Sequence, residues 1–599
     1  MSNINLTEEQ QKIINCNSNN IVVQALAGTG KTTTLVEFTK HHKDAKFLYL
    51  AFNKAIVDEA TTKFPKNVTV KTIHSIAYQW FNENYKNKIM SGFIPFAKLE
   101  AFFKQHGHDI NFPTVKRINN LLKNYYSSNL KELKKVTSEN GTFFSDKDIE
   151  KANLIIQDLK SPSGTLSVTH DFYLKLYHLA EVQLLGYDYI LFDESQDSND
   201  VITAIVLQQN TKKIFVGDKH QAIYQFRGSR DALTGFEKNA DDVFFLTHTF
   251  RYGDNLAKVA SNFLHNYKNE NKVIKGLKED TKLNIYNKLE DEKTETEEIA
   301  REVIELTIEN IKKGENTCFI SYKNMAILEL IELILEHNEL NKDFQIKYKL
   351  NGDLSKYNFD MIKIIYELLK NEKKASQDGK KSPKVDKILK DRFTDTFERH
   401  DPFSNSQNND NKKIFIEKNN LNLLKDIFKD YNTTLDFCEH MEEQKKASGG
   451  DDIYKAYKLA LKLIKFNKKD FISSIENNQR NEINPHIYLS TAHISKGLEW
   501  DSVILSDDLF NEIWNKNKKL PKYPVINLNV MKAGLKHKTN PPFAGEFPEF
   551  SNWIVIEDEY NQQANLLYVA MTRAKKSIYF PEKLVDKLKL PIQTEETDE

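Results

Sequence analysis

The first 80 residues alternate short apolar runs with longer segments in which apolar residues recur at helical spacing. Residues 20–25 (NIVVQA) and 46–52 (KFLYLAF) are rich enough in β-branched and aromatic residues to predict buried strands. Residues 31–42 and 53–64 predict helices, and residues 68–74 (VTVKTIH) predict a third strand. This order of strand, helix and strand favours a parallel sheet.

The pattern is interrupted twice further along the chain. Residues 81–180 are mostly helical and lysine-rich, and strand character returns at residues 187–195 (YDYILFDES). A second αβ pattern starts near residue 280, gives way to polar helical segments over residues 370–482, and regains strands from residue 486. We therefore predict an α/β fold with two tandem domains, each carrying a mainly helical insertion.

Composition narrows the class of protein. The chain has 599 residues, 40% hydrophobic and 28% charged, as in ordinary globular proteins of more than one domain. It lacks a run of about 18 apolar residues that would span a membrane. The N-terminus has no signal-peptide layout, and Cys16, Cys318 and Cys438 show no metal-binding or disulfide spacing. We expect a protein of the cytoplasm, or of the nucleus in a eukaryote, with no membrane partner.

The net charge does not favour any class of partner, but the small share of arginine among the basic residues helps to identify candidate site residues. Basic and acidic residues number 85 each, which neither supports nor excludes nucleic acid as a partner. Only nine of the basic residues are arginines. An arginine in this chain is therefore a candidate for a position that needs the planar, bidentate guanidinium.

A phosphate-binding loop is the first chemical motif. Residues 25–32 (ALAGTGKT) follow a predicted strand and precede a predicted helix, the context in which such loops bind nucleotides. Backbone N–H groups would cradle the β-phosphate, Lys31 would reach the β- and γ-phosphates, and Thr32 would bind Mg²⁺. The candidate ATP-binding residues here are Ala27, Gly28, Thr29, Gly30, Lys31 and Thr32.

Two adjacent carboxylates end the strand within YILFDESQD (189–197). Carboxylates at the carboxyl end of a parallel strand suit metal and water chemistry. We expect Asp193 to hold Mg²⁺ and Glu194 to activate the attacking water.

The third motif, VGDKHQAIYQFRGS (216–229), follows another strand. Gln221 is placed to sense the γ-phosphate, while Tyr224 and Phe226 alternate with polar residues beside Arg227. Exposed aromatics next to a phosphate sensor suit the stacking of nucleic-acid bases. The alternative is that both aromatic residues belong to the core.

These motifs and their order resemble the superfamily 1 DNA helicases of the UvrD/Rep/PcrA type. GDKHQAIYQFRG and THTFRYG (247–253) most resemble the F-box DNA helicase branch, although no F-box precedes the predicted motor. The resemblance extends to LTEEQ (6–10), LAFNKA (50–55), KTIHS (71–75), STAHISKGLEWDSVIL (490–505) and NLLYVAMTRAKK (565–576).

The resemblance implies roles for further residues. Gln10 and Phe250 would contact adenine, Gly497 and Glu499 would face the nucleotide, and Arg251 and Arg573 would join Glu194 and Gln221 as catalytic residues. The residues expected to contact DNA are Phe52, Asn53, His74, Tyr224, Phe226, His493 and Lys496. Relatives often carry an arginine beside the adenine, where this chain has Thr33 and Thr34.

The resemblance also implies a domain plan of two RecA-like P-loop domains, 1A and 2A, with helical inserts 1B and 2B. The expected ranges are 1–80 and 175–279 (1A), 81–174 (1B), 280–350 and 485–590 (2A), 351–484 (2B), and an acidic tail at 591–599. The cofactors would be ATP and Mg²⁺, and the DNA partner single-stranded DNA or DNA with a 3′ single-stranded tail.

The expected activity is ATP-dependent movement 3′ to 5′ along single-stranded DNA, in DNA repair or recombination. Two alternatives stay open at this point. The motor could strip proteins from DNA with little unwinding, or it could be a DNA-triggered ATPase of a defence or signalling system. Protein partners cannot be inferred from the sequence.

Overall fold

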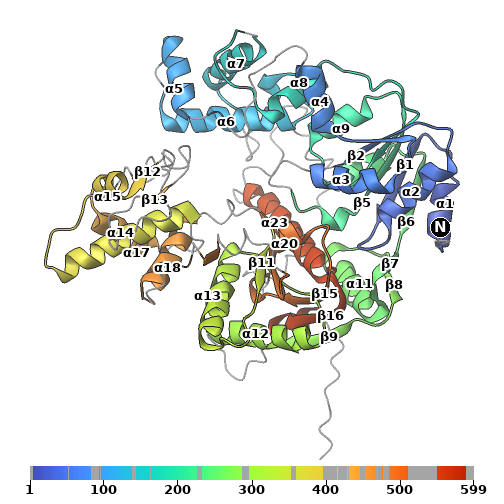
Figure 1. Ribbon diagram of the computed structural model, residues 1–599. Coiled ribbons are helices and arrows are strands. Elements are labelled where there is room, and N and C mark those ends of the chain that lie inside the picture. Colours follow the sequence, from blue (N-terminus) through green and yellow to red (C-terminus); the bar gives the residue numbers. More distant parts are fainter. Residues whose placement is uncertain are drawn as a thin grey trace, which may run out of the picture. The chain divides into compact units, whose positions relative to one another are not determined.

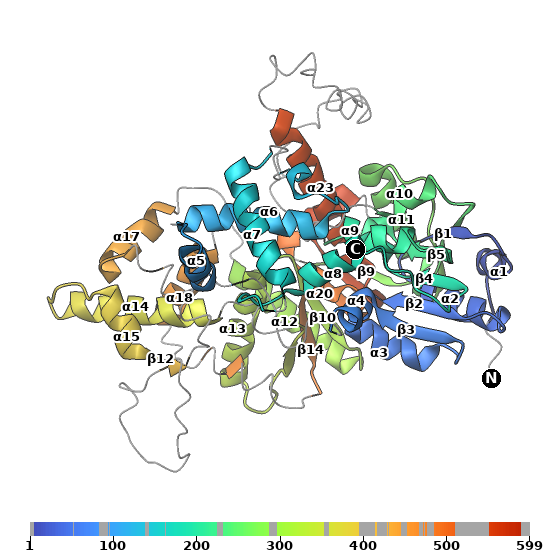
Figure 2. The same ribbon diagram turned by 90° about the horizontal axis from the view of Figure 1, so that it is seen from above.

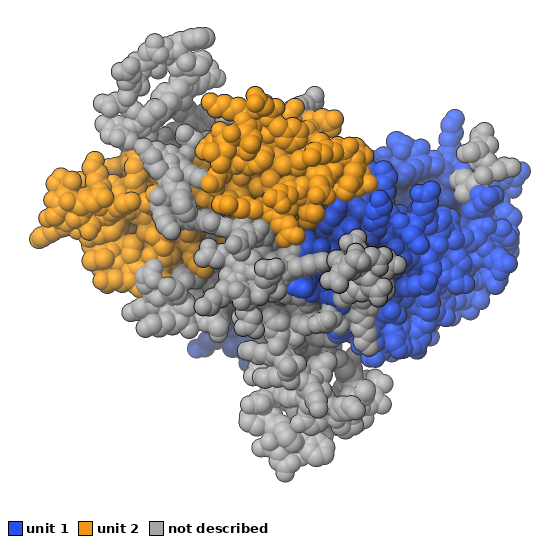
Figure 3. Space-filling view, turned by 90° about the horizontal axis from the view of Figure 1, so that it is seen from below, with its two compact units in different colours: residues 1–288, 496–599 blue, residues 289–495 orange. Residues whose placement is uncertain are grey.

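The computed structural model describes residues 5–51, 53–82, 94, 96–108, 110–137, 143–161, 163–224, 232–286, 296–352, 359–394, 414–415, 428, 431–444, 452–465, 471, 474–475, 484–509 and 550–588. Two compact units are present: residues 1–288 with 496–599, and residues 289–495 (Figure 3). This division joins the C-terminal residues to the first unit, and the domain boundaries expected from the sequence stay predictions.

A six-stranded sheet organises the N-terminal part of the first unit. Its order is β3-β2-β4-β5-β1-β6, and every pair is parallel. The strands are β1 (Asn20–Ala25), β2 (Phe47–Ala51), β3 (Val68–Thr72), β4 (Tyr189–Phe192), β5 (Lys212–Gly217) and β6 (Asp242–Leu246). The first five match the strands expected from the sequence. The apolar runs of β1, β2, β4 and β5 are buried on both faces, whereas β3 is half-buried along its length.

Helices precede and connect these strands. They are α1 (Glu8–Ile14), α2 (Lys31–His41), α3 (Lys54–Lys63), α4 (Ile73–Asn82), α9 (Asp200–Leu207) and α10 (Ala232–Glu237) (Figure 1). Of these, α1, α3 and α9 start at side-chain caps. Thr7 and Gln10 form a reciprocal capping box at α1, and Asn53 caps α3 by accepting from the Ile56 N–H.

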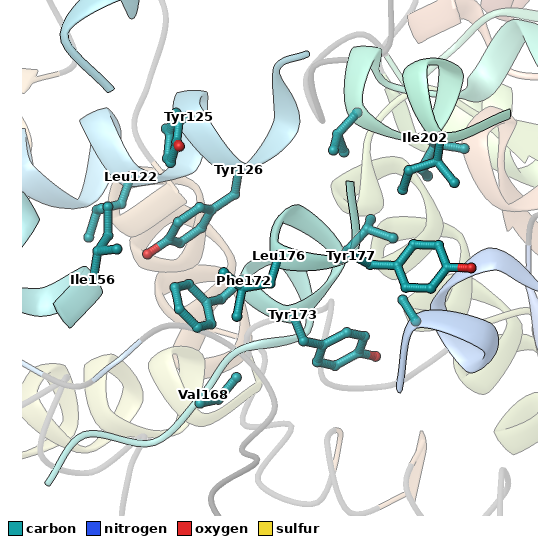
Figure 4. Packing of buried hydrophobic residues seen from close by; sticks show 14 of the residues in the cluster. Leu122, Tyr125, Tyr126, Ile156, Val168, Phe172, Tyr173, Leu176, Tyr177 and Ile202 are labelled. Carbon is teal, nitrogen blue, oxygen red and sulfur yellow. The ribbon is translucent and has the colours of Figure 1, made fainter. Parts of the chain in front are cut away.

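The predicted insertion between β3 and β4 is helical. It contains α5 (Phe96–Gln105), α6 (Phe112–Ser127), α7 (Asp146–Lys160) and α8 (His170–Leu179) (Figure 2). Figure 4 shows Phe172 and Tyr177 of α8 pointing to opposite sides of the helix. Phe172 meets Tyr126 of α6, and the Tyr177 ring meets Trp80 of α4 edge-on, each with ring centroids 5.6 Å apart. The insertion and one face of the sheet therefore share a continuous hydrophobic core, which also contains Val22 and Leu50.

The rest of the first unit adds a second group of strands and helices. The described segments are β7 (His248–Gly253), α11 (Asp254–Lys268), β8 (Lys275–Lys278), β9 (Lys282–Tyr286), β15 (Trp500–Leu505), α23 (Phe550–Met571), β16 (Ala574–Pro581) and α24 (Val585–Leu588). Strand β16 pairs in parallel with both β15 and β9. The sequence pattern had indicated β15 and β16 but not the paired strands β7 and β8.

The second unit has its own parallel strands and helices. Strand β14 (Ile487–Thr491) pairs with β10 (Thr317–Ser321) and β11 (Tyr348–Leu350). Its helices are α12 (Thr296–Lys312), α13 (Asn324–Leu340), α14 (Phe359–Gln377), α15 (Val385–Arg392), α17 (Thr434–Gln444), α18 (Asp452–Lys465) and α20 (Ala492–Ser495), and β12 (Phe393–Thr394) pairs with β13 (Ile414–Phe415).

These elements confirm the α/β class with parallel sheets and helical insertions. No helix among the described residues is long and apolar enough to cross a membrane.

Candidate nucleotide and DNA site

The candidate catalytic residues of the N-terminal sheet follow its parallel strands at one edge. The phosphate-binding loop follows β1, the Asp193–Glu194 pair follows β4, and Gln221 follows β5. Because β5 pairs with both β1 and β4, the three segments leave neighbouring strands. Ligand sites of open α/β sheets lie outside such carboxyl ends.

The phosphate-binding loop is shaped by two glycines in the left-handed region. Gly28 has φ 75° and Gly30 has φ 78°. A Cβ on Gly28 would lie 2.5 Å from the Thr249 hydroxyl and 2.8 Å from the Cβ of Arg251. The loop therefore packs directly on β7, where the N–H of Phe250 donates to the carbonyl of Gly28 over 2.8 Å. Helix α2 begins at Lys31, so Thr32 lies in its first turn, where helix N–H groups favour anions.

Lys31 contacts one of the two candidate catalytic carboxylates. Its Nζ lies 2.7 Å from Oε1 of Glu194. Burial works against the charged form of Lys31, but Glu194, Asp193 and Asp218 outweigh it and raise the Lys31 pKa. Burial likewise opposes ionisation of Glu194, yet Lys31 and Lys496 hold the Glu194 pKa well below its usual range. Glu194 is thus an anion in a left-handed backbone conformation, with φ 50°.

Asp193 has a different environment. Burial and the neighbouring Glu194 raise the pKa of Asp193. Its carboxylate accepts from the Tyr49 hydroxyl over 2.6 Å and from the Glu194 N–H over 2.8 Å. Tyr49, on β2, is a contact that the sequence motifs did not indicate.

The turn after Glu194 adds two further residues that the sequence reading missed. Gln196 donates to Oε2 of Glu194 over 2.6 Å and accepts from the Asp218 N–H over 3.2 Å. Asp197 pairs with the ammonium of Lys496. Burial raises the pKa of Asp197 to about 6, with Glu194 adding to the rise and Lys496 opposing it. The spacing D-E-S-Q-D was the available signal, because a 3₁₀ turn at Ser195–Asp197 returns these side chains to the site.

Lys496, expected to contact DNA, lies among the nucleotide-site candidates in this structure. Besides Asp197, its Nζ donates to the Gln221 carbonyl over 2.7 Å and lies 3.4 Å from Glu194. The Lys496 side chain is 9% exposed. Its expected role in DNA binding stays a prediction, and this position favours a role beside the phosphates.

Gln221 and Arg573 meet directly, although 352 positions separate them. Arg573 Nη2 donates to Gln221 Oε1 over 3.4 Å, while Nε and Nη1 donate to the carbonyls of Val569 and Leu498. Arg573 is 1% exposed. Burial, together with Arg251, lowers the pKa of Arg573 to about 9.

Arg251 and Glu499 form the neighbouring pair. Nε of Arg251 donates to Glu499 over 2.9 Å, and Nη1 donates to the carbonyl of Thr572, next to Arg573. Burial opposes ionisation of Glu499, but Arg251 keeps the Glu499 pKa below its usual range. Gly497, two residues earlier, has φ 85°. The structure therefore brings both candidate arginines together with the residues at 497–499.

The two residues expected to contact adenine, Gln10 and Phe250, lie beside Gly30 of the phosphate-binding loop. Gln10 is 2% exposed, and its amide donates to the Thr34 hydroxyl over 3.1 Å and accepts from the Thr7 N–H over 3.0 Å. Phe250 is 36% exposed. A Cβ on Gly30 would lie 3.1 Å from Gln10 and 3.5 Å from the Phe250 ring, so these side chains flank the loop.

Tyr568 is another residue that the sequence reading missed. It lies on α23, is fully buried, and its hydroxyl accepts from the Ala27 N–H over 3.0 Å. Helix α23, which ends two residues before Arg573, is thus attached to the phosphate-binding loop.

The remaining DNA candidates are dispersed. Asn53 and His74 follow β2 and β3, whose last residues Ala51 and Thr72 are paired. His74 is half-buried, and burial lowers its pKa, so it is neutral at pH 7. Tyr224 is half-buried, with Lys496 Nζ 5.7 Å from its ring centroid.

Three further DNA candidates remain. One belongs to the second unit, and two lie outside the described residues. His493 lies on α20, with its ring 6.5 Å from that of Tyr322. Phe52 and Phe226 lie outside the described residues, as does Arg227.

The residues present fit ATP and Mg²⁺. Mg²⁺ is usually held by one or two protein oxygens together with phosphates and waters. Thr32 and Asp193 supply such oxygens, and no cluster of three or more His, Cys, Asp or Glu side chains with metal-ligand geometry occurs in the described part of the chain. A bound cation would supply charge neutralisation at the phosphates.

Comparison with known proteins decides the family. Residues 6–243 match the UvrD/REP helicase N-terminal domain, and residues 328–582 match the UvrD-like helicase C-terminal domain. The chain belongs to the UvrD-like helicase family. Its two tandem UvrD helicase domains agree with the fold class expected from the sequence.

Individual relatives are distant but cover almost the whole chain. The F-box DNA helicase 1 of Gallus gallus is 27% identical over 98% of this chain and 50% of its own length. The F-box DNA helicase protein 1 of Schizosaccharomyces pombe is 27% identical over 96% of this chain and 57% of its own length. A probable DNA helicase II homolog of Mycoplasma genitalium is 21% identical over 96% of this chain. The chain thus spans about half the length of the F-box relatives that it matches.

Proposed function

We propose that this UvrD-like chain is an ATP-dependent DNA helicase that moves 3′ to 5′ on single-stranded DNA, in DNA repair or recombination. The observation that carries the proposal is that Lys31 pairs with Glu194 and that Arg573, 352 positions after Gln221, donates to Gln221. Lys496 joins the two pairs, because it contacts both Glu194 and the Gln221 carbonyl. Phosphoryl transfer depends almost wholly on such positioning and on charge stabilisation.

The residues divide the work as follows. Loop N–H groups, Lys31 and Thr32 would hold the phosphates of ATP, with Mg²⁺ beside Asp193. The ionised Glu194 would accept a proton from the attacking water, and Gln221 would orient that water. Arg251 and Arg573 would stabilise charge on the γ-phosphate. The N-terminal part of the chain supplies Lys31, Glu194 and Gln221, and the C-terminal part supplies Arg573. Movement of one part relative to the other would therefore couple ATP hydrolysis to movement along DNA.

The test is strand separation on matched substrates. We expect ATPase activity that single-stranded DNA stimulates, and unwinding of a duplex with a 3′ tail but not of one with a 5′ tail. Stimulated ATPase without strand separation on either substrate would favour protein stripping or a DNA-triggered ATPase instead. ATPase that DNA does not affect would contradict the proposal.

A further inference from the structure

The turn that carries Gln221 is held by its own strand. This turn, at Lys219–Gln221, follows β5 and is capped by Asp218, which accepts from the His220 N–H over 3.0 Å. The same carboxylate accepts from Nε2 of Gln221 over 2.7 Å. Gln196 in turn accepts from the Asp218 N–H, which links the turn to the Glu194 carboxylate.

A second carboxylate holds the turn from a different part of the chain. Glu270 Oε2 lies 3.0 Å from Nε2 of His220 and 2.8 Å from Nζ of Lys219. Its other oxygen accepts from the Lys272 N–H over 3.0 Å. The side chains of His220 and Glu270 are only 3% and 9% exposed. Burial opposes ionisation of Glu270, but the hydrogen bonds from His220 and Lys219 hold the Glu270 pKa well below its usual range.

Glu270 occupies a fixed place at the end of α11. Asn269 takes the left-handed conformation, with φ 50°, and the N–H of Glu270 donates to the Leu264 carbonyl over 3.2 Å, which closes the helix. Helix α11 begins at Asp254, three residues after Arg251. The same helix therefore connects the backbone near Arg251 to the turn of Gln221.

Helix α23 contacts the same turn. Asn565 donates to the Ala222 carbonyl over 2.8 Å, and the Tyr568 ring meets the His220 ring edge-on at 6.1 Å. Lys268, two residues before Glu270, donates to Asn561 of α23 over 2.9 Å. The backbone on both sides of Gln221 is thus held by buried groups from α11 and α23.

We propose that Glu270 is a positioning residue for ATP hydrolysis, which acts through His220 to fix the turn that presents Gln221 to the γ-phosphate. The inference rests on the proposed function. The contacts of Glu270 are with His220, Lys219 and the Lys272 N–H, so its effect on Gln221 passes through the turn. A side chain that orients the attacking water must be held within about 0.5 Å of its productive position, and a displacement of about 1 Å costs up to about 10²-fold in rate.

The experiment measures ATP turnover by Glu270→Gln at saturating single-stranded DNA. Glutamine keeps the size of the side chain but weakens the bonds to His220 and Lys219. We expect kcat to fall about 10-fold, within the range for such displacements, while KM for ATP and the thermal midpoint change little. The matched control is Glu181→Gln, which removes an exposed carboxylate that also pairs with a lysine, Lys131. His220→Gln provides a second variant at the same contact.

A double-variant cycle separates positioning from general stability. If Glu270 acts through Gln221, then Glu270→Gln combined with Gln221→Ala turns over as slowly as Gln221→Ala alone. Multiplied losses, an unchanged kcat in both Glu270→Gln and His220→Gln, or a loss that follows unfolding would overturn the inference. An unmodified chain without DNA-stimulated ATPase would instead overturn the proposed function.

Discussion

Two lysines of the first unit have contrasting environments: Lys31 is half-buried and Lys175 is buried. Lys31 in the phosphate-binding loop lies against Glu194, and nearby carboxylates raise its pKa although burial opposes them. Lys175 on α8 of the helical insertion is 1% exposed and donates to the carbonyls of Ser128 and Leu130. No carboxylate lies within 4 Å of Lys175 among the described residues, and burial lowers its pKa to about 8.

The difference lies in what surrounds the charge. The candidate nucleotide site places Lys31 and Lys496 against the carboxylates of Glu194 and Asp197, an arrangement suited to binding a polyanion. The insertion surrounds Lys175 with neutral dipoles and the ring of Tyr125, 4.5 Å away. An ammonium held by carbonyls joins backbone segments and costs desolvation energy. We infer that the first environment serves chemistry and the second serves the fold.

The largest effect should come from Lys31→Ala. Loss of the lysine removes the charge that would contact the β- and γ-phosphates, and we expect DNA-stimulated ATPase to fall by about 10³-fold or more. Single-stranded DNA affinity, measured by fluorescence anisotropy, should be nearly unchanged. Lys40→Ala is the control, since Lys40 lies on the same helix but is 51% exposed. A parallel collapse of DNA affinity would show that the two sites are not separate.

Arg573→Lys should cost about 10²-fold in turnover, below the range for a complete arginine finger because lysine keeps the charge. The guanidinium donates to four partners, which a single ammonium cannot reach in the same geometry: Val569, Leu498, Gln221 and Thr572. ATP affinity should fall less than turnover, because the contact strengthens in the transition state. Arg117→Lys, at an arginine 54% exposed, is the control. Parent-like turnover by Arg573→Lys would show that lysine suffices there.

Lys496→Ala tests whether this lysine belongs with the nucleotide or with DNA. Lys496 pairs with Asp197 and Glu194, so its loss should displace the turn at Ser195–Asp197 that follows Glu194. We expect kcat to fall about 10-fold as a result. The single-stranded DNA dissociation constant should change less than about threefold, under 1 kcal/mol. Lys576→Ala, at a lysine 59% exposed, is the control. An unchanged kcat with weakened DNA binding would support the role expected from the sequence.

Local patterns predicted strands β1 to β5 and the phosphate-binding loop, because both depend on neighbouring residues. Strand β1 was expected at residues 20–25 and is observed at Asn20–Ala25, since its apolar run is buried in the sheet. Tyr568 and Asn565 could not be assigned contacts in this way. Their partners, Ala27 and Ala222, are hundreds of positions away and contribute only backbone groups, which leave no trace in sequence type.

The same limit explains Glu270 and Lys496. Glu270 is one of many acidic residues in the chain and lies just after α11. Its contact with His220 depends on the position of the C-terminus of α11 in the folded protein. Lys496 stands in a motif whose resemblance implied DNA contact, whereas its neighbours in this structure are Asp197 and the Gln221 carbonyl. The residue types of the site were predictable from the sequence, but the pairs they form were not.

The smallest effect should appear at Lys175, as a change in the pH dependence of stability. The folded pKa of about 8 lies below the ordinary value of 10.5, so between these values the unfolded chain binds more protons than the folded one. The free energy of unfolding of the parent should therefore rise with pH across this window, relative to Lys175→Met, by at most about 1.4 kcal/mol per pH unit. Below pH 8 both states are protonated and the difference between the two proteins should be constant. Denaturant unfolding at pH 7.5, 8.5 and 9.5 measures the difference, with Lys160→Met at an exposed position of α7 as the control. The prediction is wrong if the difference in free energy of unfolding between the parent and Lys175→Met stays constant, or falls, as pH rises. The helical insertion would then stabilise the charged form of Lys175 as effectively as the carboxylates stabilise that of Lys31.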